Sequence, residues 1–267
     1  MNKRIAAFVL TTVFILCTGL VGNAQQTIEK IRQAGVIKVG MTGNQPPYTM
    51  EAKDGSLMGF EVDLAELLAE SMDIKLEIVR LPFKDLLPAL EKGSIDAIMS
   101  GMTITMSRNT RAAFVGPYML SGKSILTKME VLAKADEKED LNQADLNLTA
   151  LSGSTSQKFI ELFLPEANYI PADNYDIALQ MLRNDEAHAL VADYAVCMLD
   201  AIRYTDEGFV TLADPLNIEP IGMALPPSDP LLMNFMENYI KALEMSGILA
   251  DMEAYWFENG DWLEEIK

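Results

Sequence analysis

Apolar residues recur along the chain with two different periods, and these periods predict its helices and strands. Between positions 60 and 72 they return every three or four residues, which is the spacing of one face of a helix. Between positions 74 and 78 they alternate with polar residues, as in a half-buried strand. Together with short apolar runs, the pattern predicts strand, helix, strand, helix and strand over residues 36–41, 60–72, 74–78, 83–90 and 95–99. That order favours a parallel, doubly wound sheet.

The same succession of strands and helices begins again in the second half of the chain. A charged run over residues 134–140, typical of a solvated loop or helix face, separates the two parts. After it, the apolar pattern predicts strands at 146–151, 187–192 and 221–225 and helices at 159–163, 177–182 and 230–246. Asp229 and Pro230 are a typical start for the last helix, and Gly247 is a typical stop. The restart predicts a second α/β lobe.

The first 24 residues have the features of a secretory signal peptide. Lys3 and Arg4 form a basic start, residues 5–16 are an apolar core, and residues 22–24 read Gly-Asn-Ala, a small-residue cleavage pattern. The apolar segment is too short and wrongly flanked for a spanning helix. We therefore expect export to the periplasm or the cell exterior and cleavage after Ala24, with an uncleaved anchor as the alternative.

Charge and cysteine content narrow the choice of partners. The net charge is −18, and loss of residues 1–24, which contain two basic residues and no acid, would make it −20. A chain this acidic is a poor partner for nucleic acid or for an anionic membrane surface. The mature part keeps one cysteine, Cys197, whose apolar neighbours indicate a buried, inert thiol. The sequence has no cluster of histidines and cysteines, so we expect neither a metal site nor another cofactor.

The stretch from Ser100 to Arg108 is the first candidate site. It follows the buried strand predicted at 95–99, and its small and hydroxylated residues bring backbone and hydroxyl groups to the end of that strand. Ligands of open α/β sheets bind at this edge. The guanidinium of Arg108, five residues after Thr103, offers a planar fork of donors that suits a carboxylate. The stretch therefore predicts a carboxylate site, and a polar loop with a surface arginine is the alternative.

Several motifs, in the order of the chain, carry a resemblance to a known family. They read GFEVDL at 59–64, LLPAL at 86–90, GSIDA at 93–97, MTIT at 102–105 with Arg108, and GPY at 116–118, with weaker support from SGST at 152–155 and VADY at 191–194. With these motifs the sequence resembles the bacterial extracellular solute-binding proteins of polar amino-acid ABC transporters, family 3. The similarity covers nearly the whole mature chain.

The resemblance implies an α/β fold of two doubly wound lobes joined by two hinge strands, the type II periplasmic-binding-protein-like fold. It assigns about residues 25–126 and 221–267 to lobe 1 and about 127–220 to lobe 2. In this family the ligand is held in the cleft between the lobes, which close over it by a hinge. The closed complex then docks on a membrane permease. We expect a compact monomer.

The resemblance assigns several residues of the first lobe to the binding of an amino acid. Arg108 matches the arginine that grips the α-carboxylate, and Thr103 matches the hydroxyl that touches both α-groups. Gly101 matches the backbone position that accepts a hydrogen bond from the α-ammonium. Phe83 matches the aromatic residue that stacks on the ligand side chain, or it fills the core. Gln45 stands where many relatives have an aromatic residue, so the specificity end departs from the usual pattern.

The second lobe supplies the remaining residues that the resemblance implies. Asp193 resembles the carboxylate that pairs with the α-ammonium, with a helix cap as the alternative role. Ser154 and Thr155 resemble the loop that adds donors to the carboxylate, ahead of a helix whose N-terminus favours an anion. For Thr155 the alternative is that it only caps this helix.

The implied function is that of an extracytoplasmic protein that captures an L-amino acid and delivers it to an ABC transporter permease, without catalysis. The first alternative is an enzyme similar to the cyclohexadienyl or arogenate dehydratases, which resemble this scaffold and need a general acid in the cleft. Residues 194–197 hold no carboxylate where those enzymes carry a glutamate, which disfavours this alternative. A receptor sensor domain is also disfavoured, because no second apolar run is long enough to span a bilayer.

The residues at the matched positions also indicate which charge the side chain of the ligand carries. Asn44, Gln45 and Phe83 offer an apolar face and amide groups but no charge. A cationic side chain would need a buried carboxylate, and the matched positions contain none for it. An anionic side chain would need a second cation, for which Lys84 and Lys123 are loose candidates. We therefore expect an L-amino acid with a neutral or modestly polar side chain.

Overall fold

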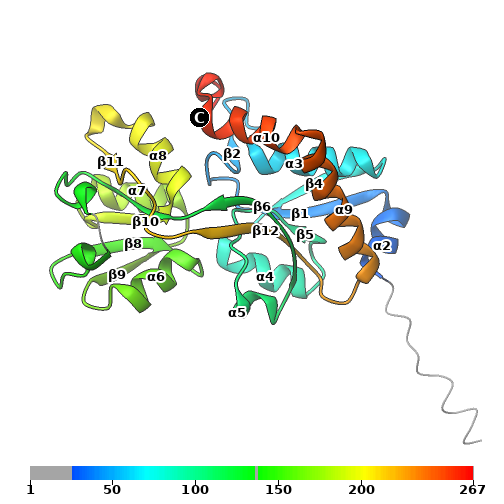
Figure 1. The fold of residues 1–267 in the computed structure, drawn as a ribbon, viewed down its shortest axis with the longest axis horizontal. Coiled ribbons are helices and arrows are strands. Elements are labelled where there is room, and N and C mark those ends of the chain that lie inside the picture. Colours follow the sequence, from blue (N-terminus) through cyan, green and yellow to red (C-terminus); the bar gives the residue numbers. More distant parts are fainter. Residues whose placement is uncertain (1–25, 136–137, 267) are drawn as a thin grey trace, which may run out of the picture.

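Two five-stranded sheets form the frame of the molecule in this computed structural model, which describes residues 26–135 and 138–266. The first sheet has the strand order β4 (Lys75–Arg80), β1 (Val36–Met41), β5 (Ala97–Ile98), β12 (Glu219–Leu225) and β6 (Ala113–Ser121). The second has the order β11 (Val210–Thr211), β7 (Lys123–Thr127), β10 (Ala189–Asp193), β8 (Asn147–Leu151) and β9 (Asn168–Ala172). Figure 1 shows them as two halves, each surrounded by its own helices. The predicted signal peptide lies outside the described residues.

The predicted strand and helix order of the first half is confirmed. Strand β1 pairs in parallel with both β4 and β5, as expected when helices cross between them. These crossover helices are α3 (Phe60–Ser71) and α4 (Phe83–Glu91). Strand β5 spans only two of the five residues predicted, because the chain leaves the sheet there to form the loop that contains Ser100 to Arg108. The remaining helices of this half are α2 (Thr27–Ala34), α5 (Met106–Asn109), α9 (Pro230–Ser246) and α10 (Ile248–Glu253).

Two antiparallel segments connect the halves (Figure 1). Strand β6 runs from the first sheet through Gly122 into β7, which pairs with β10 and β11 of the second sheet. Residues 123–126 therefore lie in the second sheet, although the resemblance assigned them to the first lobe. The chain returns along β12, whose first residue pairs with the last residue of β6. The start of β12 and the start of β7 thus meet where the two halves join.

Side-chain caps mark the start of two helices of the second half, α6 (Thr155–Phe163) and α7 (Tyr175–Arg183). The Ser154 hydroxyl accepts a hydrogen bond from the backbone of Gln157, and Asn174 caps the next helix in the same way. The next helix is α8 (Tyr194–Arg203). Shorter elements are β2 (Met50–Glu51), β3 (Leu57–Met58) and helical turns at 132–134, 138–141, 205–207, 254–258 and 261–264. None of the helices in the described residues combines the length and the apolar character that a membrane span requires.

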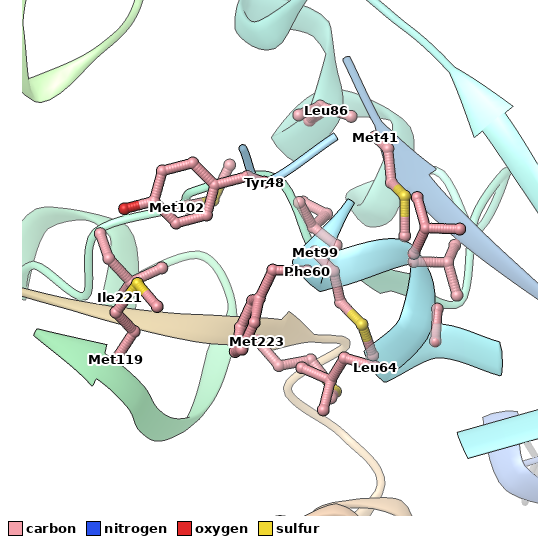
Figure 2. Packing of buried hydrophobic residues seen from close by; sticks show 14 of the residues in the cluster. Met41, Tyr48, Phe60, Leu64, Leu86, Met99, Met102, Met119, Ile221 and Met223 are labelled. Carbon is pink, nitrogen blue, oxygen red and sulfur yellow. The ribbon is translucent and has the colours of Figure 1, made fainter. Parts of the chain in front are cut away.

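The core of the first half supports the loop that contains Tyr48. Figure 2 shows Tyr48, Phe60 and Leu64 packed among methionines, which adapt to irregular gaps. The aromatic tail of the chain contributes Phe257, whose ring lies 5.3 Å from Tyr48 and 5.5 Å from Phe60 between centroids. Tyr48 and Phe60 are fully buried. Complete burial of a large apolar side chain such as Phe stabilises the fold by roughly 1.5–3 kcal/mol. The loop that contains Tyr48 is therefore held in place by a buried apolar core.

Candidate functional site

Hydrogen bonds between the two halves bring most of the predicted site residues together. Two of these bonds join Gln45 Nε2 to Asp193 Oδ2 (3.3 Å) and Arg108 Nη2 to the Gly153 carbonyl (3.3 Å), and the hydroxyl oxygens of Thr103 and Thr155 lie 3.2 Å apart. In each pair, one residue comes from the first half and the other from the second. The residues that the resemblance selected therefore line one junction, where β5, β8 and β10 end.

Arg108 is buried at this junction, so the alternative of a surface arginine is wrong. Only 7% of the residue is exposed, and its Nη1 donates to the Thr103 carbonyl at 2.8 Å. The guanidinium lies 5.4 Å from the centre of the Phe83 ring. Burial lowers the pKa of Arg108 to about 10, although Glu219 and Asp193 oppose this, so the group stays cationic at pH 7. Its hydrogen bonds go to main-chain carbonyls, and no carboxylate of the described residues forms an ion pair with it.

The hydroxyls of Thr103 and Thr155 both donate to one carboxylate that sequence reasoning missed. The acceptor is Glu219 Oε2, at 2.8 Å from Thr103 Oγ1 and 2.9 Å from Thr155 Oγ1. Burial by itself would raise the pKa of Glu219. The contacts with Lys123 and the two hydroxyls lower it by more, so the pKa of Glu219 lies below its usual value. Glu219 is therefore ionised at neutral pH. Its sequence signal is weak, because it stands just outside the apolar run 221–225 that predicted the strand.

Lys123 is the partner that joins Glu219 to Asp193. Its Nζ lies 2.6 Å from Asp193 Oδ1 and 2.9 Å from Glu219 Oε2, and only 1% of the lysine is exposed. Burial disfavours the ammonium, but the two carboxylates outweigh burial and raise the pKa of Lys123. Asp193 precedes α8 without forming a side-chain cap to it, so its carboxylate is directed to Lys123 and Gln45. The three charged groups carry one net negative charge.

Ser154 and Thr155 divide the two roles that the sequence left open. Ser154, not Thr155, is the N-cap of α6, because its Oγ accepts from the Gln157 backbone at 3.1 Å. The alternative in which Thr155 only caps the helix is therefore wrong. As the first helical residue, Thr155 directs its hydroxyl across the junction to Thr103 and Glu219. In this arrangement the Thr155 hydroxyl donates to Glu219, and Ser154 positions Thr155 at the start of α6.

Gly101 and Gln45 are packed against each other in the first half. Gly101 has φ +55°, a region that favours glycine, and a Cβ there would overlap Gln45 Nε2. The Gly101 backbone donates to both oxygens of the buried Glu61 at 2.8 and 3.0 Å, and the Tyr118 hydroxyl also contacts Glu61. Burial raises the pKa of Glu61 to about 7, although the bonds from Tyr118 and Gly101 oppose it. Gln45 Oε1 is a buried acceptor with no partner among the described residues.

A pocket of about 530 Å³ lies beside Phe83 and is lined by both halves, including Asn44, Lys84 and Asp173. Phe83 is 6% exposed, so it packs in the core while its face meets Arg108. Lys84 Nζ contacts Asp173 at 2.6 Å across the mouth, and both side chains are solvent-exposed. Asn44 contacts Asp176 there at 3.4 Å. The volume is in the range of small-molecule sites in proteins.

Two α/β halves, two connecting strands and charged groups that converge between the halves define a ligand-binding protein of the two-lobe type. The chain belongs to the bacterial extracellular solute-binding proteins, family 3, whose sequence profile matches residues 37–259. The resemblance found in the motifs and the predicted two-lobe fold are thereby confirmed. From here the halves are called lobe 1, with the first sheet, and lobe 2, with the second.

The relatives include an enzyme and several binding proteins. Cyclohexadienyl dehydratase from Pseudomonas aeruginosa is 24% identical over 249 residues, covering 91% of this chain and 92% of that protein. The glutamine-binding protein of Geobacillus stearothermophilus is 31% identical over 201 residues, covering 74% and 75%.

The similar solved structures also include amino-acid-binding proteins. The ancestral amino acid-binding protein AncCDT-1, a precursor of cyclohexadienyl dehydratase, is 33% identical with a TM-score of 0.79, covering 86% of this chain and 99% of that one. A transporter binding component from Wolinella succinogenes complexed with lysine is 29% identical with a TM-score of 0.82, at the same coverage. The chain is therefore similar to amino-acid-binding proteins along nearly its full described length.

Proposed function

We propose that this protein captures an L-amino acid in the cleft between its lobes. The observation that carries the proposal is Arg108, a buried guanidinium whose hydrogen bonds go only to main-chain carbonyls among the described residues. Burying a cation without a counter-ion is costly. A ligand carboxylate would supply that counter-ion through charge-assisted hydrogen bonds. The hydroxyls of Thr103 and Thr155 lie at the same junction, where both donate to Glu219.

The charge distribution of the cleft also suits an α-amino group. Asp193, Glu219 and Lys123 together carry one net negative charge, and Arg108 carries one positive charge. A zwitterion presents the opposite pair, so its ammonium would neutralise the acidic cluster while its carboxylate meets Arg108. Gln45 Oε1, a buried acceptor without a partner among the described residues, would gain a donor.

We further infer that the protein works outside the cytoplasm as a monomer and delivers its ligand to an ABC transporter permease. Family membership supports this role, because the family consists of extracellular solute-binding proteins. The N-terminal features of residues 1–24 support export. Gene neighbourhood is a simple check, since permease and ATPase genes beside this one favour transport.

A thermal-shift screen of the mature protein against the common amino acids tests the proposal. A ligand at 100 times its dissociation constant should stabilise the protein by about 2.7 kcal/mol, which corresponds to roughly 5–10 °C in Tm. Arg108→Ala should abolish this shift, with at least about 100-fold weaker binding, because a buried charge-assisted bond is lost. Arg111→Ala is the matched control, since Arg111 pairs with Glu91 on the exposed surface.

The role of the acidic cluster and the role of Arg108 can be tested separately. An amino acid should bind more tightly than its deaminated analogue if the acidic cluster receives an ammonium. Equal affinity of wild type and Arg108→Ala in calorimetry would contradict the central assignment, provided that circular dichroism shows both to be folded.

A dehydratase activity is the second candidate, because one relative is a cyclohexadienyl dehydratase. Such an enzyme needs a protonated acid at the leaving hydroxyl. The buried cleft carboxylate Glu219 is held ionised by Lys123 and two hydroxyls, which disfavours this role. Incubation with prephenate followed by product analysis decides: turnover that depends on Glu219 would establish the enzyme.

A further inference from the structure

Lys123 is the feature of the cleft that the proposed function leaves unexplained. Lysine is almost never buried unless it is paired, and here its ammonium contacts two carboxylates, Asp193 and Glu219. Asp193 is 4% exposed and Glu219 is 8% exposed, so all three charges are withdrawn from water. Without the lysine, the junction would hold two adjacent buried acids.

A charge enclosed in this cleft acts over a longer range than one at its mouth. Buried charges interact in a medium of low dielectric constant, whereas exposed pairs such as Lys84 and Asp173 are screened by water and salt. Arg108, Lys123, Asp193 and Glu219 sum to zero, and an amino acid with a neutral side chain leaves that sum unchanged. Arginine or lysine would add one uncompensated positive charge. Glu61, which accepts a hydrogen bond from the Gly101 backbone, is a further buried acid near the cleft. It is unchanged in the variants that test the inference, so it does not affect their comparison.

We propose that Lys123 is the specificity-determining residue of this cleft, and that it makes the site discriminate against cationic amino acids by offsetting one of two buried carboxylates. The inference rests on the proposed function and deepens it. If Lys123 were neutral, Asp193 and Glu219 would leave one unpaired negative charge, which a cationic side chain would satisfy. Leaving a buried charge unpaired is strongly unfavourable.

Competition calorimetry with L-glutamine and L-arginine at pH 7.5 tests the inference in wild type and Lys123→Met. Methionine keeps most of the volume of the lysine but removes its charge. The ratio of arginine to glutamine affinity should rise by at least about tenfold in Lys123→Met, because a buried charge that repels a cationic side chain is removed. Lys38→Met is the matched control and should leave the ratio unchanged, since Lys38 pairs with Glu77 on the exposed surface.

A second substitution separates charge from shape. The double variant Lys123→Met with Glu219→Gln restores the charge sum of the wild type, and its affinity ratio should return to within about threefold of the wild-type value. If the double variant keeps the arginine preference, the effect of Lys123 is steric and the inference is overturned. It is equally overturned if folded Lys123→Met has the wild-type ratio, or if wild type binds arginine more tightly than glutamine.

Glu219→Gln alone provides a test that does not depend on the folding of Lys123→Met. This variant adds one net positive charge to the cleft, so L-glutamate should gain at least about tenfold over L-glutamine. An unchanged glutamate-to-glutamine ratio would overturn the inference. Failure of wild type to bind any amino acid would instead overturn the proposed function, so the two failures are distinguishable.

Discussion

At the scale of single residues, Glu61 couples the candidate site to pH. Its carboxylate accepts from the Gly101 backbone and contacts the Tyr118 hydroxyl, so it holds the loop that carries Thr103. The residue is fully buried, and burial raises its pKa from 4.5 to about 7. The folded state therefore binds a proton that the unfolded state has already lost in this range. Stability should be greatest below pH 4.5 as far as Glu61 is concerned, and should fall as pH rises towards 7.

Glu61→Gln should remove this loss of stability, because the amide keeps the shape and does not ionise. Between pH 5 and pH 7.5, the free energy of unfolding of wild type should fall relative to that of Glu61→Gln by about 2–3 kcal/mol. Urea unfolding over that range measures the difference. Asp200, whose pKa burial raises to about 6, titrates in both proteins and cancels. Parallel stability curves would show that Glu61 does not change its protonation in this range.

At the scale of elements, Asp229 joins the starts of two helices. Its Oδ1 accepts from the backbones of Leu231 and Leu232 at the start of α9, at 3.1 and 3.0 Å. Its Oδ2 accepts from the Ile28 backbone at the start of α2, at 2.8 Å. The sequence predicted the first role from the Asp-Pro signal. The second role links two helices that lie far apart in the chain and could not be predicted from local signals.

Asp229→Ala should therefore cost more than the loss of an ordinary helix cap. We expect a decrease of about 2–4 kcal/mol in the free energy of unfolding, because a cap is lost and the buried Ile28 N–H loses its acceptor. Asn174→Ala is the control, since Asn174 caps only α7 and should cost about 1 kcal/mol. Urea denaturation compares the two. Equal losses would mean that the bond to Ile28 contributes nothing.

At the scale of the whole molecule, the two lobes share part of an apolar cluster and also make polar contacts around the cleft. These include the exposed pair of Lys84 and Asp173 and the hydroxyl contact of Thr103 and Thr155. Exposed ion pairs contribute little to stability. Interfaces of this kind between domains permit relative motion by default. The ligand should therefore add the contacts that favour the closed arrangement.

Small-angle scattering should detect this closure. The mature protein should be a monomer with a radius of gyration of about 18 Å, the value for a compact chain of its size, and the radius should decrease when the ligand saturates the site. The Arg108→Ala variant should show no decrease at the same ligand concentration. An unchanged radius in wild type at saturation, established by calorimetry on the same sample, would argue against hinge closure.

The sequence by itself determined the features that depend on local chemistry. Periodic apolar positions predicted β1, α3, β4 and α4 nearly to the residue, because a helix or strand with one buried face must repeat its apolar residues at its own period. Asp229 and Gly247 predicted both ends of α9 for the same local reason. The motif at 102–108 singled out Thr103 and Arg108, and the structure places both in the junction.

Only the tertiary structure decided which charges are buried together. Strand β6 carries no clean period of burial, and β7 carries none because it is buried at every position. Glu219 looked like an ordinary charged residue beside an apolar run, and Lys123 was only a loose candidate for a cation that faces the ligand side chain. Burial of a charge is tolerable only when an opposite charge reaches it, and here each partner comes from a different strand. The pairing depends on the crossing of two strands at the hinge. A local sequence pattern cannot predict this crossing.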